Sequence, residues 1–331
     1  MNARNISRRT FSGWLGAAGC AGCAGPLLAK AQGKYPDKPI RLLVGLAAGG
    51  SLDAMARSIS QRMQAQGAQL VIDNKPGASM MLSASEVARA QPDGYTLLFA
   101  PSSVFAQNPH TLSNVPYDPF RDFTPITMVA RGPLVLVTST TLPVTSVKEL
   151  VAWAKAHPGQ LNFASFGTGT SSHIYALNFC KTVGIEAAHV PYKGTGDVAN
   201  DLMSGRIQAY FDASPTAIQN SKTGKIRMLG VAAPKRMAAA PEVPTFTEQG
   251  VPGMDLTSWV AIYGPAKMPK DLVARVNAVL VTAIDAPDVK EFIARGAYEA
   301  QGSTPEELAQ ETKSAYDQWG EMIKKIGYQK E

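Results

Sequence analysis

From residue 40 onward, the apolar positions of this chain alternate between strand-like and helix-like periods. Residues 40–46 are mostly apolar, as is typical of a buried strand, and the strand ends at Gly49-Gly50. The next apolar residues recur at helical spacing: Leu52, Met55, Ala56, Ile59 and Met63. A strand at 70–73, a helix at 82–90 and a strand at 95–100 follow. This β-α-β-α-β pattern predicts parallel strands joined by right-handed crossovers.

The middle of the chain repeats the same rhythm. Strands are predicted at residues 134–139, 161–165, 187–192, 207–211 and 226–232, and helices at 146–157, 171–183 and 197–204. Ser146 and Glu149 form a capping box at the start of the first of these helices. The proline-containing stretch 108–125 has no clear period, and we expect it to be an ordered loop.

Helices dominate the last part of the chain. One more strand is predicted at 258–263, and apolar residues at helical spacing from Leu272 to Leu280 mark the next helix. Thr304-Pro305-Glu306-Glu307 begins another, with a capping box and a proline at its first position. Such a tail suggests that the chain returns to its first lobe, with crossings near 133–137 and 258–264. We therefore expect one lobe from residues 35–134 and 260–331, and a second from 135–259.

The first 31 residues have the pattern of an export signal. Ser7-Arg8-Arg9-Thr10-Phe11 is a twin-arginine motif, and a weakly apolar stretch follows at 14–28. Ala29-Lys30-Ala31 is a small-x-small cleavage site, so we expect residues 1–31 to be removed and the protein to be periplasmic. A lipid anchor at Cys20 or Cys23 is the alternative. Cleavage at Ala31 leaves only Cys180, which cannot form an intramolecular disulfide.

Composition excludes several classes of protein. The 331 residues are 45% hydrophobic and 18% charged, and no apolar run reaches the roughly 18 residues that span a bilayer. The net charge of +6 falls to about +2 without the leader. Four of the chain's 32 basic residues lie in the leader, and none of its 26 acidic residues does. Basic stretches interleaved with aromatic residues are missing, so we expect no nucleic acid to bind.

Two segments share one construction, a strand followed by a glycine-rich loop and the start of a helix. The first loop is Ala47-Ala48-Gly49-Gly50-Ser51 and the second is Phe166-Gly167-Thr168-Gly169-Thr170-Ser171-Ser172. Glycines allow close approach of the backbone, and the first N–H groups of a helix attract an anion without a lysine or arginine. Opposed loops from the two lobes would hold a carboxylate from both sides. Tight turns without a ligand are the alternative.

Further candidates for ligand contact are weaker. The junction Ala100-Pro101-Ser102-Ser103 resembles the two loops. His173 has a donor role or a packing role, Asp53 complements its helix dipole or meets an amino group, and Asp212 lines the cleft or orders a loop. Nucleotide-binding and nucleophile-elbow motifs are missing, and the histidines are scattered, so we expect no metal, no cofactor and no catalytic residues.

Ordered motifs extend over the whole mature chain. They include Tyr35-Pro36-Asp37-Lys38-Pro39, Ala47-Ala48-Gly49-Gly50-x-x-Asp53, Asn74-Lys75-Pro76-Gly77-Ala78, Gly167-x-Gly169-Thr170-x-x-His173, Val190-Pro191-Tyr192-Lys193-Gly194, Phe211-Asp212-Ala213 and Ser258-Trp259. With them the chain closely resembles the Bug family, the extracytoplasmic receptors of tripartite tricarboxylate transporters.

The resemblance implies an α/β fold of the two-lobe periplasmic-binding-protein type (type II, Venus flytrap), with mainly parallel sheets flanked by helices and two crossover segments. It implies a carboxylate ligand between the two glycine-rich loops, held largely by backbone groups and bridging waters. The expected contact residues are Leu46, Ala48, Gly49, Ser51, Asp53, Ser102, Ser103, Phe166, Gly167, Gly169, Thr170, Ser171, His173 and Asp212. The implied partners are membrane subunits of a transporter or a sensor protein, and we expect a monomer.

Departures from the family pattern bear on the ligand. Gly45-Leu46 stands where the family usually has Pro-Phe, and Phe166 and Leu52 replace small or polar residues. Ser79-Met80-Met81 stands where glycine and small residues are usual. If Phe166 and Leu52 face the cleft, the pocket is narrower and more apolar than a citrate site, which favours a monocarboxylate or aromatic carboxylate. The alternative functions are an exported enzyme acting on a small carboxylate and a structural or adhesion protein.

Overall fold

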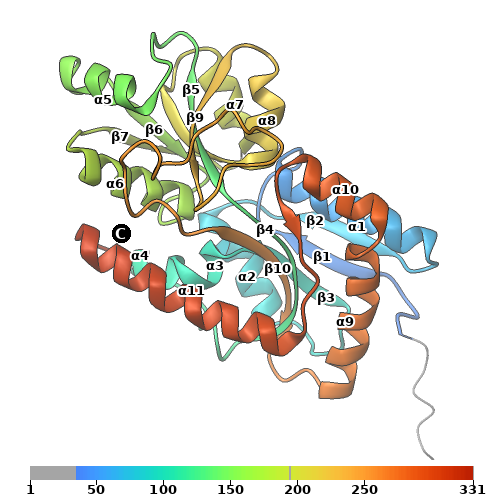
Figure 1. Ribbon diagram of the computed structural model, residues 1–331. Coiled ribbons are helices and arrows are strands. Elements are labelled where there is room, and N and C mark those ends of the chain that lie inside the picture. The colour runs from blue at the N-terminus through green and yellow to red at the C-terminus, as the bar shows by residue number, and fades with distance from the viewer. Residues whose placement is uncertain (1–34, 194, 331) are drawn as a thin grey trace, which may run out of the picture. The chain divides into compact units, whose positions relative to one another are not determined.

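The computed structural model describes residues 35–193 and 195–330. These residues fold into two sheets, each flanked by helices (Figure 1). The six-stranded sheet has the order β11-β4-β10-β3-β1-β2, and its elements with their helices are called the first lobe. Its strands are β1 (Ile40–Val44), β2 (Leu70–Asn74), β3 (Thr96–Pro101), β4 (Phe123–Gly132), β10 (Ser258–Pro265) and β11 (Glu299–Ala300).

The five-stranded sheet, with the order β7-β6-β8-β5-β9, belongs to the second lobe. Its strands are β5 (Leu134–Ser139), β6 (Asn162–Ser165), β7 (Ala188–Pro191), β8 (Ala209–Ala213) and β9 (Ile226–Ala232). The chain passes from the first sheet to the second at Pro133, between β4 and β5, and it returns between β9 and β10. The two-lobe α/β architecture is thereby confirmed, while the lobe boundaries given above stay predictions.

Both sheets are mixed rather than mainly parallel. β1 pairs in parallel with β2 and β3, and β6 pairs in parallel with β7 and β8, as the β-α-β rhythm predicts. The strands next to the crossings run the other way: β10 is antiparallel to β3 and β4, and β5 is antiparallel to β8 and β9. A strand that enters a sheet from the other lobe is not constrained by a right-handed βαβ crossover, so the periodic pattern did not reveal its direction.

The helices of the first lobe are α1 (Ser51–Ala65), α2 (Met81–Ala88), α3 (Ser103–Ala106), α4 (Asn108–Thr111), α9 (Lys270–Ile284), α10 (Pro287–Arg295) and α11 (Pro305–Ile326), with the short 3₁₀ turn η1 (Ala78–Met80). Those of the second lobe are α5 (Val147–Ala156), α6 (Ser171–Val183), α7 (Thr195–Met203) and α8 (Ser214–Ser221). The side chains of Ser146 and Thr304 accept hydrogen bonds from the backbone N–H groups of Glu149 and Glu307, so both predicted helix starts are correct.

The predicted loop at 108–125 is wrong at both ends, since α4 occupies its start and β4 begins at Phe123. Thr124, Pro125 and Thr127 interrupt the apolar period of β4, yet the strand pairs with β10 along its length. α8 and α10 were also missed. Because both are short and begin with a proline in their first turn, their sequences resemble turns.

α11 returns along the first lobe, where it contacts α3 and β4, and it also contacts α6 of the second lobe (Figure 1). At this contact, the rings of Tyr175 on α6 and Trp319 on α11 meet edge to face, with centroids 5.3 Å apart. Within the described residues, the helices are too short or too polar to cross a membrane. The expected leader, with Cys20, Cys23 and the cleavage site at Ala31, lies outside the described residues.

Candidate functional site

The loop between β1 and α1 turns at Gly49 and begins the helix at Ser51. Gly49 has a φ of +88°, which favours glycine. Its N–H donates to the Asp53 carboxylate at 3.0 Å, and Arg57 Nε donates to the same oxygen at 2.8 Å. Burial acts to raise the pKa of Asp53, but the hydrogen bonds from Arg57 and Gly49 outweigh it and lower the pKa. Asp53 is therefore an anion that closes its own loop and complements the helix dipole.

Three amides of the second glycine-rich loop are paired with side chains of the same loop. The N–H of Phe166 donates to Ser172 Oγ at 3.2 Å, that of Gly167 to Ser165 Oγ at 3.2 Å, and that of Gly169 to His173 Nδ1 at 3.1 Å. Gly169 faces the first lobe, because a Cβ atom there would lie 2.2 Å from Thr111 Oγ1. The same loop presents the Phe166 side chain to the cavity that it shares with the first lobe.

A cavity of about 30 Å³ lies where the two lobes meet. The first lobe contributes eight of its lining residues and the second lobe three. They are Leu46, Ser51, Leu52, Met55, Pro101, Ser258, Val260 and Tyr298 from the first lobe, and Leu134, Phe166 and Ala213 from the second. Phe166 thus faces Leu46 and Leu52 across this inner cavity. Both Phe166 and Leu52, the two residues on which the expectation of a narrower and more apolar pocket depends, line this cavity.

A larger outer cavity of about 210 Å³ adjoins the inner one at Ser51 and Met55, which line both. Gly49 and Gly50 form one wall of this outer cavity, and α8 and α10 form the others. Polar and basic side chains are found here, namely those of Thr216, Gln219, Lys222 and Arg295. The first helical turn of α1 therefore lies at the junction of an apolar chamber and a polar one.

Of the predicted contact residues, Leu46, Ser51 and Phe166 line the inner cavity and Gly49 lines the outer one. The remaining ones line neither of these two cavities: Ala48, Asp53, Ser102, Ser103, Gly167, Gly169, Thr170, Ser171, His173 and Asp212. Ser102 comes close, since its Oγ lies 3.3 Å from the Oγ of Ser258 in the cavity wall. The hydroxyls of Ser103 and Ser171 are buried with no partner among the described residues.

His173 is part of the framework of the second loop. It stacks on His189 with ring centroids 3.6 Å apart, and only 3% of it is exposed. Burial, with a smaller contribution from His189, lowers the pKa of His173 to about 3. Because its Nδ1 accepts from Gly169, His173 caps the loop and packs on His189, and the neutral ring carries its proton on Nε2.

Asp212 lies behind the cavity wall at the end of β8, next to Ala213, which lines the cavity. Its carboxylate accepts a hydrogen bond from the hydroxyl of Thr216 on α8. Burial raises the pKa of Asp212 to about 7, and the hydrogen bonds from Thr216 and Ala213 offset only part of that effect. The charge of Asp212 in turn adds to the effect of burial in raising the pKa of Tyr298, which lines the cavity from the first lobe.

Most of the residues that line the inner cavity but were not predicted from the sequence lie outside the sequence motifs. Met55 lies one helical turn after Leu52, so helical spacing could have placed it on the same face. Pro101 and Ala213 are neighbours of the chosen Ser102 and Asp212. Tyr298 follows α10, more than 80 residues beyond Ala213, and nothing local in the sequence indicates that its ring faces the cleft.

Hydrogen bonds of Ser79 join the two lobes beside the second glycine-rich loop. Ser79 Oγ donates to the carbonyl oxygen of Thr168 at 2.6 Å, and Asn108 Nδ2 donates to the Ser79 carbonyl oxygen at 2.9 Å. Ala78, Ser79 and Met80 all have left-handed φ angles, of 47°, 50° and 70°. This conformation costs non-glycine residues free energy, so neighbouring contacts must hold the segment in place.

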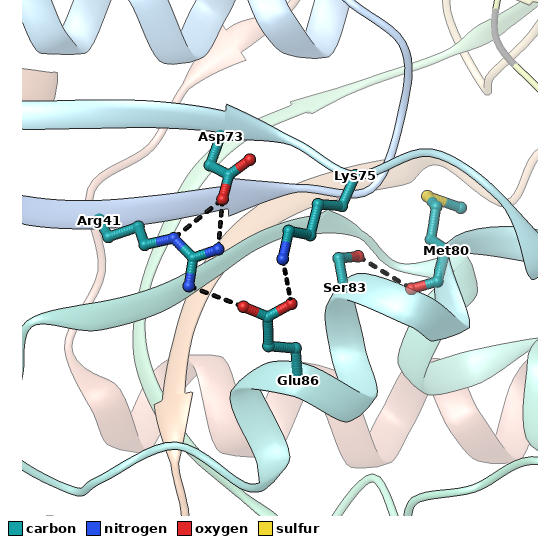
Figure 2. A network of polar contacts seen from close by, with 6 residues as sticks. All are labelled: Arg41, Asp73, Lys75, Met80, Ser83 and Glu86. Atoms are coloured by element: carbon teal, nitrogen blue, oxygen red, sulfur yellow. Dashed lines mark hydrogen bonds and ion pairs between the residues drawn. The ribbon is translucent and has the colours of Figure 1, made fainter.

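A network of four charges anchors that strained segment (Figure 2). Arg41 of β1 binds Asp73 of β2 and also reaches Glu86 of α2, with 2.7 Å between Nη1 and Oε1. Lys75, just after β2, binds the other oxygen of Glu86. The network fixes the chain on both sides of residues 78–80, since Lys75 precedes them and α2 follows.

The described residues hold no group of three or more histidine, cysteine, aspartate or glutamate side chains that could bind a metal ion. Cys180 on α6 is half-buried, and burial raises the pKa of its thiol to about 12, which makes it a poor nucleophile at neutral pH. The inner cavity itself is lined by eight apolar side chains and by the hydroxyl-bearing Ser51, Ser258 and Tyr298. This arrangement is suited to holding a small molecule.

The sequence matches the family model described as tripartite tricarboxylate transporter family receptor over residues 55–328. A UPF0065 protein of Pseudomonas sp. strain P51 is 35% identical over 291 residues, which is 87% of this chain and 86% of the relative. Protein BugT of Bordetella pertussis is 32% identical over 273 residues, 82% of each chain.

Solved structures with the same fold include periplasmic binding protein BugD, with a TM-score of 0.86 and 30% identity over 90% of this chain and 100% of BugD. A protein of R. palustris determined with adipate has a TM-score of 0.86 and 30% identity, and the match covers 89% of this chain and 99% of that one. MatC of Rhodopseudomonas palustris with bound malate has a TM-score of 0.83 and 28% identity, covering 87% and 100%.

Proposed function

Because the chain belongs to the tripartite tricarboxylate transporter receptor family, we propose that it is an extracytoplasmic solute-binding protein that captures a small carboxylate between its two lobes. One observation carries the proposal: a cavity is lined from both lobes, and the first turn of the 15-residue helix α1 lies at its edge. Unpaired N–H groups at such a helix start favour an anion. The adipate and malate bound to two relatives support a carboxylate as the ligand.

A ligand that touches both lobes explains why the cavity is divided between them. Contacts from Phe166 in the second lobe and Ser51 in the first exist together only when the lobes are close. Binding therefore favours the closed arrangement by as much as those contacts contribute. The hydrogen bond from Ser79 to Thr168, made between the lobes, also stabilises the closed arrangement.

Several finer points belong to the proposal. We propose export by the twin-arginine pathway with cleavage after Ala31, and delivery of the ligand to membrane subunits of a transporter or to a sensor protein. We also propose a monomer with no catalytic activity. Mass spectrometry of the protein from the periplasmic fraction tests the first point: a mature mass starting at Gln32 supports it, and a lipid-modified Cys20 or Cys23 contradicts it.

Thermal unfolding with a panel of carboxylates tests the central function. A ligand present at 100 times its Kd stabilises the folded state by about 2.7 kcal/mol, which is readily measured. Native mass spectrometry of protein purified from cell extract complements the panel by looking for a co-purifying acid. If no carboxylate raises the unfolding temperature and none co-purifies, the proposal is wrong. Turnover of a carboxylate would favour the exported enzyme instead.

A further inference from the structure

We infer that Tyr298 is a specificity-determining residue, whose ring closes one side of the inner cavity and thereby limits the length of the ligand. The inference rests on the proposed function and concerns the same cavity. It starts from the way in which the inner cavity borders two other spaces. One is the outer cavity, and the other is a groove of about 510 Å³ beside the crossings between the lobes.

This groove, called the crossing groove, is lined by residues of both crossings. Gly132 and Pro133 belong to the passage from β4 to β5, and Ala233 and Thr257 belong to the return between β9 and β10. Among the described residues, Tyr298 is the one that lines both the crossing groove and the inner cavity. The boundary between these two spaces is therefore Tyr298.

The position of the Tyr298 ring follows from its contact with Gly132. A Cβ atom on Gly132 would lie 1.9 Å from Cδ1 and 2.3 Å from Cε1 of Tyr298, so the ring fills the space that a side chain there would need. Because Gly132 lines the crossing groove, the ring lies between that groove and the inner cavity. Only 7% of Tyr298 is exposed. With backbone behind it, the ring yields little to a ligand that presses on it.

The boundary between the inner and outer cavities has a different character. It is formed by Ser51 and Met55, which line both, and a methionine side chain is unbranched and flexible. Gln219, Lys222 and Arg295 line the outer cavity beyond it. An acid group is favoured on this side, where the two cations attract it. The rest of the ligand then extends through the inner cavity toward Tyr298.

A limit on length follows from this arrangement. Each further methylene that enters the inner cavity is removed from water and strengthens binding. Once the ligand reaches the Tyr298 ring, the next carbon has to displace a packed aromatic side chain, which is unfavourable. Without the ring, the inner cavity would open into the crossing groove and longer ligands would fit.

Two homologous series of acids test the limit by calorimetric titration: unbranched monocarboxylates from butyrate to decanoate, and unbranched dicarboxylates from succinate to sebacate. With the unaltered protein, affinity in the series that binds should rise by about fourfold per methylene up to one length and fall beyond it. In Tyr298→Ala the rise should continue past that length. The first acid beyond the limit should bind at least ~10-fold more tightly to Tyr298→Ala than to the unaltered protein.

Three further variants make the result specific to the ring. Tyr298→Phe keeps the ring and should keep the limit, whereas Tyr298→Leu should move it in the same direction as Tyr298→Ala and replaces that variant if it does not fold. Tyr316→Ala is the matched control. Tyr316 packs on His110 and Phe120 in the same lobe and lines none of the three spaces, so its loss should leave the limit unchanged.

The outcomes separate this inference from the function on which it rests. Affinity that rises without a limit in the unaltered protein overturns the inference, and so does an identical limit in a folded Tyr298→Ala or Tyr298→Leu variant. A shifted limit in Tyr298→Phe also overturns it, since the hydroxyl rather than the ring would then select the ligand. All three results leave the carboxylate-binding function standing. Binding of no acid from either series overturns the inference, and together with a failed carboxylate panel it overturns the proposed function as well.

Discussion

Met80 occupies the space that a side chain at Gly45 would need: a Cβ atom on Gly45 would lie 2.6 Å from the Cβ and 2.7 Å from the Cγ of Met80. Met80 is 1% exposed and has a φ of +70°. The absence of a side chain at Gly45 therefore makes room for Met80 just before the cavity residue Leu46.

Gly45→Ala should destabilise the protein by about 1–3 kcal/mol, the usual cost of overpacking a core. Its effect should be smaller in a Met80→Gly background, because the Cβ and Cγ of Met80 are then gone and only Ser83 Oγ, 2.7 Å away, remains close. Met80→Ala is the control: it keeps the Cβ and should rescue less. Urea unfolding of the single and double variants gives the coupling free energy, and strictly additive effects would contradict this relationship.

Ser79→Ala should weaken ligand binding by about threefold to tenfold, because it removes a hydrogen bond made between the lobes. The loss should be found mainly in a faster dissociation rate, measured by stopped-flow fluorescence. Ser60→Ala is the matched control, since Ser60 Oγ also donates to a carbonyl oxygen at 2.6 Å, that of Leu70, but within the first lobe. Equal effects of the two substitutions on dissociation would argue against Ser79 as an interlobe contact.

The raised pKa of the buried Asp212 should make the stability of the protein depend on pH. Burial raises the pKa of Asp212 from 3.8 to about 7, so the folded protein binds this proton more tightly than the unfolded chain does. The resulting stability is present at acidic pH and is lost as the pH rises from about 4 through 7, by up to about 4 kcal/mol. The neighbouring Tyr210 and Tyr298 stay neutral in this range, because burial raises the pKa of each.

Asp212→Asn removes the titrating group and should flatten this pH dependence. Compared with the unaltered protein, the variant should gain stability at pH 8 relative to pH 5. Urea unfolding at the two pH values measures the difference. The same slope in both proteins would mean that Asp212 does not carry the proton.

Ser51→Asp should abolish carboxylate binding without harming the fold. A negative charge in the first turn of a helix stabilises it by about 0.3–1 kcal/mol. At Ser51, however, it also faces the inner cavity and repels an anionic ligand, so affinity should fall by at least ~100-fold. Ser51→Asn is the isosteric neutral control and should bind far better. Retained affinity in Ser51→Asp would exclude the start of α1 as the position of the carboxylate.

The sequence predicted the parts of the fold whose pattern is local. The strands and helices around the two glycine-rich loops follow from apolar periods, and Leu46, Ser51 and Phe166, which the sequence singled out, line the inner cavity. β4 was missed because Pro125 and two threonines break its period, although pairing with β10 holds it in the sheet. The direction of β5 and β10 depends on where the chain crosses between lobes, which no local pattern encodes.

The site was harder to predict than the fold for a similar reason. Glycine-rich loops before helices suggested free amides, yet Ser165, Ser172 and His173 pair with three amides of the second loop. Whether an amide is free depends on side-chain hydrogen bonds that spacing alone does not specify. Tyr298 reaches the cavity only through the packing of the segment after α10 against the second lobe.

A crystal structure with a bound carboxylate tests the central claim most directly. The account predicts the carboxylate group within hydrogen-bonding distance of Ser51 at the start of α1, and the rest of the ligand against Phe166 of the second lobe. A carboxylate bound instead by Lys222 and Arg295 in the outer cavity, or by the backbone of the second loop, would contradict it.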